Sequence, residues 1–178
     1  AEYEKARHQR GGFSEAPASG QRDILFLANF SYIPNGEAAR VLIEQIYPRI
    51  KQTHPDCRLL LAGRGPTPFM REAAGKETNI VVTGEVPDIR PYLAAASVMV
   101  VPLQKGSGTR FKILEAFAAG CPVISTTKGA EGLKVVYGEH LLIADEIDTM
   151  VGKIGQIWSD APLGERLAAS ALELVRSE

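Results

Sequence analysis

Residues 97–120 read SVMVVPLQKGSGTRFKILEAFAAG, and this stretch decides the fold. An apolar run of strand length at 97–103 leads into a loop that contains Gly106 and Gly108. After the loop, apolar residues recur with the spacing of an amphipathic helix. A strand, a glycine loop and a helix in succession are typical of α/β proteins. The N–H groups at the start of such a helix can point at an anion.

Two basic residues, Arg110 and Lys112, fall in the first turn of this predicted helix, which we place at 108–119. The helix dipole is positive there, so an exposed cation is disfavoured by about 0.3–1 kcal/mol. A bound anion would reverse that sign, and we therefore expect a phosphate or diphosphate site, with Glu115 one turn further along. The loop residues of this site are Gly106, Ser107, Gly108 and Thr109. For the glycines alone, ordinary turn chemistry is an equally good interpretation.

The same alternation of apolar strands and amphipathic helices extends along the chain. The predicted strands are 24–28, 58–62, 79–82, 98–101, 122–125 and 141–143. The predicted helices are 37–53, 68–74, 87–95, 108–119, 147–158 and 162–175. Strands that are apolar on both faces and alternate with helices indicate a sheet covered on both sides. The predicted fold class is α/β, a doubly wound, mostly parallel, six-stranded Rossmann-like sheet.

Composition places the chain among ordinary water-soluble domains. Its 178 residues suit one domain at 23–178, after a polar stretch at 1–22 that we interpret as a linker or disordered tail. The net charge of −1 gives no indication of nucleic-acid binding. Cys57 and Cys121 lie far apart and fit no metal spacing, so we expect reduced thiols in a cytoplasmic protein. No apolar run reaches the roughly 18–20 residues that span a bilayer.

Ligands of such sheets bind outside the carboxyl ends of the strands, so three further loops, 29–35, 63–66 and 83–86, could contact a ligand. Arg64 lies between two glycines after the second strand, where an arginine can hold a phosphate with two parallel hydrogen bonds. An exposed turn arginine is the alternative. After the third strand come Gly84, Glu85 and Val86, whose backbone could meet the edge of a base.

Lys112 and Glu115 are three residues apart and therefore share one face of the predicted helix. They fit a surface ion pair and a ligand contact equally well, because a carboxylate can also accept hydroxyl protons from a sugar. The three histidines have no mutual spacing, and no nucleophile set can be assembled from the sequence.

Taken together, the motifs resemble the C-terminal half of the group 1 glycosyltransferases over about residues 23–176. The motifs that carry the resemblance are GRGP at 63–66, VTGEVPD at 82–88, ILEAFAAGCPVIST at 113–126 and GAEGL at 129–133. Members of this family are retaining enzymes whose B-type fold has two facing Rossmann-like domains. The resemblance implies that this half binds the nucleoside diphosphate-sugar. It also implies that Glu115 holds the ribose hydroxyls, that Gly108 and Thr109 meet the diphosphate, and that 84–86 meet the base.

Three positions depart from the family pattern. Ser107 stands where the family has the glutamate that usually touches the donor sugar, and Asn29 and Asn35 align with the Arg and Lys that stabilise the leaving diphosphate. The GSGTRxK form resembles a subgroup associated with surface-polysaccharide synthesis. In this subgroup we expect Arg110 and Lys112 to act as the catalytic cations, without a metal ion or any other cofactor.

The resemblance implies a missing N-terminal domain that binds a saccharide or lipid-linked acceptor. Through that domain the full-length protein could associate peripherally with a membrane. Two other functions stay open. A non-catalytic module that binds a nucleotide or a partner protein would explain Ser107, Asn29 and Asn35. Half of a nucleotide-sugar epimerase would fit the loops, but its catalytic histidine and carboxylates cannot be placed.

Overall fold

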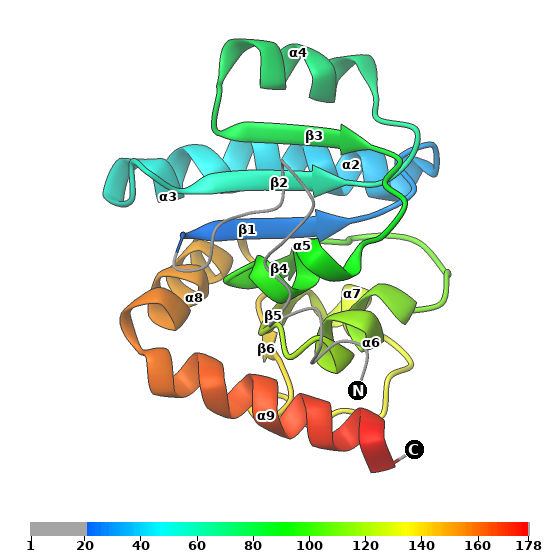
Figure 1. Ribbon diagram of the computed structural model, residues 1–178, viewed down its shortest axis with the longest axis vertical. Coiled ribbons are helices and arrows are strands. Elements are labelled where there is room, and N and C mark those ends of the chain that lie inside the picture. Colours follow the sequence, from blue (N-terminus) through cyan, green and yellow to red (C-terminus); the bar gives the residue numbers. More distant parts are fainter. Residues whose placement is uncertain (1–20, 178) are drawn as a thin grey trace.

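Six parallel strands form the centre of the protein, which is described here by a computed structural model covering residues 21–177 (Figure 1). The strands are β1 (Asp23–Leu27), β2 (Arg58–Ala62), β3 (Ile80–Gly84), β4 (Val98–Val101), β5 (Val123–Ser125) and β6 (Leu142–Ile143). Their order across the sheet is β3-β2-β1-β4-β5-β6, and every pairing is parallel. This is the strand order of the Rossmann fold, so the predicted doubly wound α/β fold is confirmed. Of the predicted linker, residues 1–20 lie outside the described residues.

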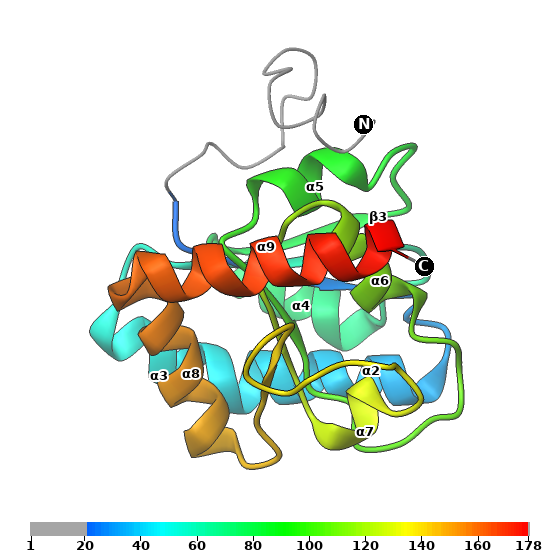
Figure 2. The same cartoon turned by 90° about the horizontal axis from the view of Figure 1, so that it is seen from below.

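Helices cover both faces of the sheet (Figure 2). They are α2 (Ile33–Val41), α3 (Tyr47–Thr53), α4 (Pro68–Lys76), α5 (Arg90–Ala95), α6 (Phe111–Ala118), α7 (Thr127–Ala130), α8 (Ile147–Ser159) and α9 (Ala161–Ser177), with a π-helical segment η1 (Leu42–Ile46). On one face, α8 packs against η1 and α3, which continue α2. On the other face, α6 packs against α9, and α5 lies beside them. The chain reverses its winding direction between β1 and β4, and ligands of doubly wound sheets bind at that switch point.

The helical stretch after β1 differs from the uninterrupted helix predicted at 37–53. It begins earlier, at Ile33, with Pro34 in its first turn, where a missing N–H does no harm. In its middle, the N–H of Tyr47 donates to Leu42 O, five residues back, which is the bond of a π-turn. Pro48 follows directly and has no N–H to continue the ordinary helical ladder. The proline explains why the helix widens at this point.

The helix after β4 is also shorter than the predicted 108–119. It begins at Phe111, and Arg110 is its N-cap residue, with φ −91° and ψ 28°. The prediction that Arg110 lies in the first helical turn is therefore wrong, whereas Lys112 does lie there. The short helix α7 was not predicted at all. Its N-cap is Thr126, whose Oγ1 accepts a hydrogen bond from Gly129 N at 2.8 Å.

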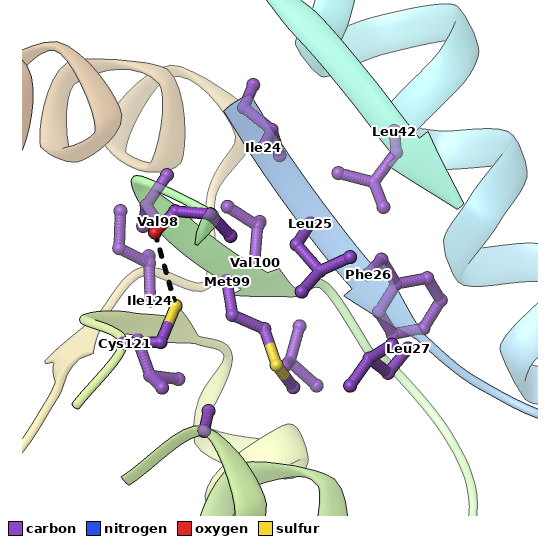
Figure 3. Close-up of a cluster of buried hydrophobic side chains, with 14 of the residues drawn as sticks. Ile24, Leu25, Phe26, Leu27, Leu42, Val98, Met99, Val100, Cys121 and Ile124 are labelled. Atoms are coloured by element: carbon purple, nitrogen blue, oxygen red, sulfur yellow. Dashed lines mark hydrogen bonds between the residues drawn. The ribbon is translucent and has the colours of Figure 1, made fainter. Parts of the chain in front are cut away.

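The centre of the core consists of β1 and β4, which are buried along their whole length (Figure 3). Apolar side chains on both faces of these strands, such as Phe26 and Met99, explain their near-continuous apolar sequence. At the opposite edge from the glycine loops, the buried carboxylate of Asp23 accepts two 2.8 Å hydrogen bonds from Arg58. Cys57 and Cys121 are free, buried thiols, as expected for reduced cysteines.

Candidate nucleotide-sugar site

The loops after β1 and β2 touch each other at the carboxyl edge of the sheet. Phe30 N donates to Arg64 O at 2.9 Å. Gly63 has a φ of +136°, and a Cβ on it would lie 1.9 Å from Ala28 O. Only glycine fits that approach, so the GRGP motif keeps two loops of the candidate site in contact.

The glycine loop after β4 lies beside the loop after β1, across the switch point of the sheet. Gly106 has a φ of +110°, and a Cβ on it would come within 3.3 Å of the Tyr32 hydroxyl. Lys105 Nζ lies 3.5 Å from a carboxylate oxygen of Glu37 on α2, in an exposed ion pair. The structure thus brings the predicted diphosphate loop next to the N-terminal end of α2.

Lys112 connects the two helices at this point. Its Nζ donates to Asn35 Oδ1 at 3.1 Å, and the Asn35 amide in turn donates to Asn29 O at 2.8 Å. The ammonium also lies 4.8 Å from the centre of the Phe26 ring. The sequence identified Asn29 and Asn35 only as departures from a pattern. The structure shows that they support the lysine, and only the contact across 77 residues of sequence could reveal this.

The charge of Lys112 is poorly balanced. Burial, and secondarily the charge of Arg110, lower the pKa of Lys112 to about 8. Neither α2 nor α6 has an acidic residue in its first turn. Among residues 21–177, Lys112 forms no ion pair with a carboxylate. Two helix N-termini and an ammonium therefore meet with little negative charge, which favours an anion at this place.

Glu115 lies on the same helix, one turn further in. Burial raises the pKa of its carboxyl group, and the nearby Lys112 charge opposes that rise. The side chain is half-buried and does not belong to the lining of the surface pocket described below. No salt bridge joins Glu115 to Lys112 within the described part of the chain, so the surface ion pair considered from the sequence is not formed.

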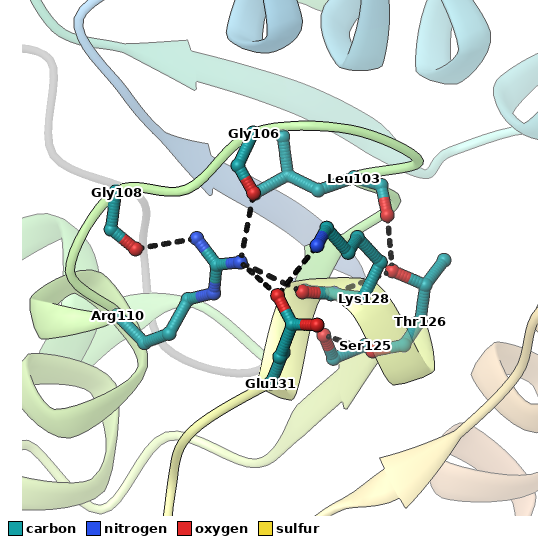
Figure 4. A network of polar contacts seen from close by, with 9 residues as sticks. Leu103, Gly106, Gly108, Arg110, Ser125, Thr126, Lys128 and Glu131 are labelled. Carbon is teal, nitrogen blue, oxygen red and sulfur yellow. Dashed lines mark hydrogen bonds and ion pairs between the residues drawn. The ribbon is translucent and has the colours of Figure 1, made fainter.

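The Arg110 side chain points into the interior of its own loop, toward Lys128 and Glu131 (Figure 4). The residue is only 8% exposed. Its guanidinium donates to three backbone carbonyls, of Gly108 at 2.6 Å, Lys128 at 2.9 Å and Gly106 at 3.3 Å. A carboxylate oxygen of Glu131 lies 3.6 Å away and also pairs with Lys128. This network was not predicted, because its acceptors are main-chain atoms that carry no signal in the sequence.

The remaining predicted residues lie at the same edge of the sheet but are more scattered. Ser107, Gly108 and Thr109 are exposed on the glycine loop, and Arg64 is exposed on the loop after β2. Gly84 has a φ of +70°, and its carbonyl accepts a 3.0 Å bond from Gly63 N. Glu85 and Val86 follow it at the end of β3, two strands away from β1.

A surface pocket of about 310 Å³ opens beside the glycine loop. Its lining consists of Gly108, Thr109, Arg110, Phe111, Leu114, Glu131, Gly132 and Leu133. Within residues 21–177, no cluster of three or more His, Cys, Asp or Glu side chains could hold a metal ion. No helix in the same range is both long and apolar enough to cross a bilayer.

Comparison with known proteins places this chain in a family. The family described as glycosyl transferases group 1 matches residues 21–160. The chain belongs to the group 1 glycosyltransferases. The predicted resemblance is thereby confirmed over most of the described structure.

Relatives within this glycosyltransferase family are considerably longer than the chain. It is 28% identical over 160 residues to the phosphatidyl-myo-inositol mannosyltransferase of Mycobacterium leprae, covering 87% of this chain and 42% of that protein. It is 30% identical over 130 residues to the lipopolysaccharide core biosynthesis mannosyltransferase LpsB of Rhizobium meliloti. This match covers 66% of this chain and 36% of that protein. The chain therefore spans well under half the length of these two relatives.

Solved glycosyltransferase structures share the fold. The C-terminal domain of the group 1 glycosyltransferase LpcC from Francisella tularensis superposes with a TM-score of 0.71 and 22% identity, over 91% of this chain and 87% of that domain. HepE of Anabaena, solved in complex with UDP-glucose, has a TM-score of 0.74 and 16% identity, over 89% of this chain and 44% of that protein. Because these sequence identities are low, the two structures show that the fold is shared and nothing further about this chain.

Proposed function

We propose that this chain is the donor-binding part of a retaining glycosyltransferase that moves a sugar from a nucleoside diphosphate-sugar to a saccharide or lipid-linked acceptor. The observation that carries the proposal is the position of Lys112, which spans the switch point between the N-termini of α6 and α2. Fixed positive charge at this place can bind a diphosphate and stabilise it as a leaving group.

The residues around Lys112 have distinct roles in this proposal. The N–H groups of the glycine loop and the ammonium of Lys112 bind the diphosphate, and the half-buried carboxylate of Glu115 accepts the ribose hydroxyls. Exposed Arg64 provides a second cation for a phosphate oxygen. The backbone of Gly84, Glu85 and Val86 meets the base. Since these groups neutralise the diphosphate, the proposal includes no metal ion.

Similar proteins support the same chemistry and suggest a setting. HepE has been solved with UDP-glucose, and also with UDP and glucose. The mannosyltransferases quoted above act on phosphatidyl-myo-inositol and in lipopolysaccharide core synthesis, as their names state. We therefore place the proposed reaction in the synthesis of a cell-surface glycan. The acceptor would be held by a part of the protein outside this chain, where a peripheral membrane contact could also form.

Calorimetric titration of the 178-residue chain with uridine and guanosine diphosphates tests the proposed site. We expect one of the two to bind, and Lys112→Met to weaken that binding by roughly tenfold or more, because one charge-assisted contact is worth about 1.5–3 kcal/mol. Lys76→Met, which changes an exposed lysine on α4, serves as the matched control and should bind like the wild type. Addition of EDTA should leave the affinity unchanged.

A non-catalytic module is the second candidate, and Ser107 is the residue that favours it, since the family has a sugar-binding glutamate there. If neither diphosphate binds at millimolar concentration, the nucleotide site is refuted and a partner-binding module is favoured. If a diphosphate binds but the full-length protein turns over no nucleotide-sugar, the module is non-catalytic.

A further inference from the structure

We infer, on the basis of the proposed diphosphate site, that Arg110 is a positioning residue that shapes the glycine loop and does not itself bind the diphosphate. Its guanidinium holds two carbonyls of the loop, those of Gly106 and Gly108, and one carbonyl of α7, that of Lys128. It thereby ties the loop after β4 to the segment after β5 (Figure 4).

The burial and the charge of Arg110 both argue against a direct contact with a ligand. The residue is 8% exposed, and its positive charge already faces three carbonyl oxygens and the carboxylate of Glu131. Arg110 also lines the surface pocket beside the loop, but Nη1 and Nη2 hold these acceptors and would have to leave them to reach a diphosphate beside Lys112. Lys112 needs no such movement, because its Nζ already lies at the switch point beside Asn35.

Geometry of the peptide unit explains what Arg110 does for the loop. In a trans peptide, the C=O of one residue and the N–H of the next point in opposite directions, and no cis peptide is present among the described residues. Because Arg110 draws the carbonyls of Gly106 and Gly108 inward, the N–H groups of Ser107 and Thr109 point away from it. Both residues are exposed, and within residues 21–177 neither N–H has an acceptor. Two unpaired, outward-facing amides of this kind can bind an anion.

Other contacts hold the ends of the loop and leave its middle to Arg110. Thr126 Oγ1 donates to Leu103 O at the start of the loop, and Lys105 pairs with Glu37 on α2. In the middle of the loop, the carbonyls of Gly106 and Gly108 each accept a hydrogen bond from Arg110. The guanidinium is suited to this task, because its planar fork donates to several acceptors at once, whereas an ammonium is a point charge.

Charge-conserving and charge-removing variants separate positioning from direct binding. If Arg110 shapes the loop, Arg110→Lys should weaken nucleoside diphosphate binding about as much as Arg110→Met, by roughly tenfold, because an ammonium cannot span the three carbonyls. If Arg110 binds the diphosphate directly, Arg110→Lys should bind clearly better than Arg110→Met, because an ammonium still attracts a phosphate as a point charge. In contrast, Lys112→Arg should retain binding, because that site needs a charge and not a fork.

A measurement on the ligand-free chain tests the role of Arg110 whether or not the chain binds a diphosphate. Backbone ¹⁵N relaxation of the free chain should show faster motion at 106–109 and at 128–131 in both Arg110 variants, and unchanged motion there in the Lys76→Met control. If the wild type binds no diphosphate, the relaxation experiment still decides the role of Arg110. Unchanged relaxation in Arg110→Lys would overturn the inference, as would wild-type affinity in that variant. If Arg110→Met does not fold, the affinity and the relaxation are both measured on Arg110→Lys, which keeps a positive charge beside Glu131.

Discussion

At the scale of single residues, Lys112 predicts how binding depends on pH. Burial and the neighbouring charge of Arg110 lower the pKa of Lys112 to about 8, so the free chain loses this charge as the pH rises through that value. Only the charged form attracts a diphosphate. We therefore expect the affinity to be highest near pH 7 and to fall as the pH rises above 8, whereas protonation of the terminal phosphate, with a pKa of about 6, weakens binding at lower pH. Calorimetry in buffers of different ionisation enthalpy should also show proton uptake on binding near pH 8.

Lys112→Arg is the control for this pH profile, because a guanidinium does not titrate in the accessible range. Its affinity should stay constant between about pH 7 and 9, where neither the guanidinium nor the base of the ligand titrates. If the wild type and Lys112→Arg lost affinity in parallel, another group would be responsible and the role of Lys112 would be refuted.

At the scale of secondary-structure elements, glycines at two positions should respond to alanine in opposite ways. Gly63, after β2, has a φ of +136°, and an added Cβ would lie 1.9 Å from Ala28 O. We expect Gly63→Ala to lower the free energy of unfolding by about 2 kcal/mol or more, since backbone strain and overpacking add. Gly152, inside α8, has nothing within 4 Å of an added Cβ. Gly152→Ala should raise the free energy of unfolding by roughly 0.5–1 kcal/mol.

Urea unfolding of both variants, followed by circular dichroism, checks this pair. Gly152→Ala controls for the general effect of replacing glycine on the unfolded chain. A Gly63→Ala protein as stable as the wild type would show that the loops after β1 and β2 do not need their close approach.

The elements also show what a sequence can and cannot predict. All six strands were predictable, because strands buried on both faces leave apolar runs such as 98–101. The start of α6 was misplaced by three residues, since glycines and a threonine fit a loop and a helix end equally well. The place of Lys112 in the first turn of this helix was predictable from the helical spacing, but its contact with Asn35 was not. The orientation of Arg110 was not, because a side chain that binds main-chain carbonyls can find them in almost any sequence.

At the scale of the whole molecule, the strand order explains why residues distant in sequence form one site. After β3 the chain crosses to the other side of β1 and forms β4 beside it, so the loop after β4 lies next to the loop after β1. Lys112 and Asn35, which are in contact there, are 77 residues apart in the sequence. Lys112 and the N-terminus of α2, which we propose to bind the diphosphate, thus come from two helices on opposite faces of the sheet. Under the proposed function, all the residues that we assign to the diphosphate therefore belong to this chain.

Transfer of the sugar should nevertheless need more than the donor site. A reaction between two bound molecules depends on holding their reacting atoms about 3–3.5 Å apart, and this chain spans only 42% and 36% of the two mannosyltransferases it resembles. We expect the 178-residue chain to bind a nucleoside diphosphate but to release it from UDP- or GDP-sugars no faster than its Lys112→Met variant, in a coupled assay for the free diphosphate. The full-length protein, assayed in the same way with a saccharide or lipid-linked acceptor, should exceed its own Lys112→Met variant by at least about tenfold. Acceptor-dependent transfer by this chain alone would show instead that the donor half also positions the acceptor.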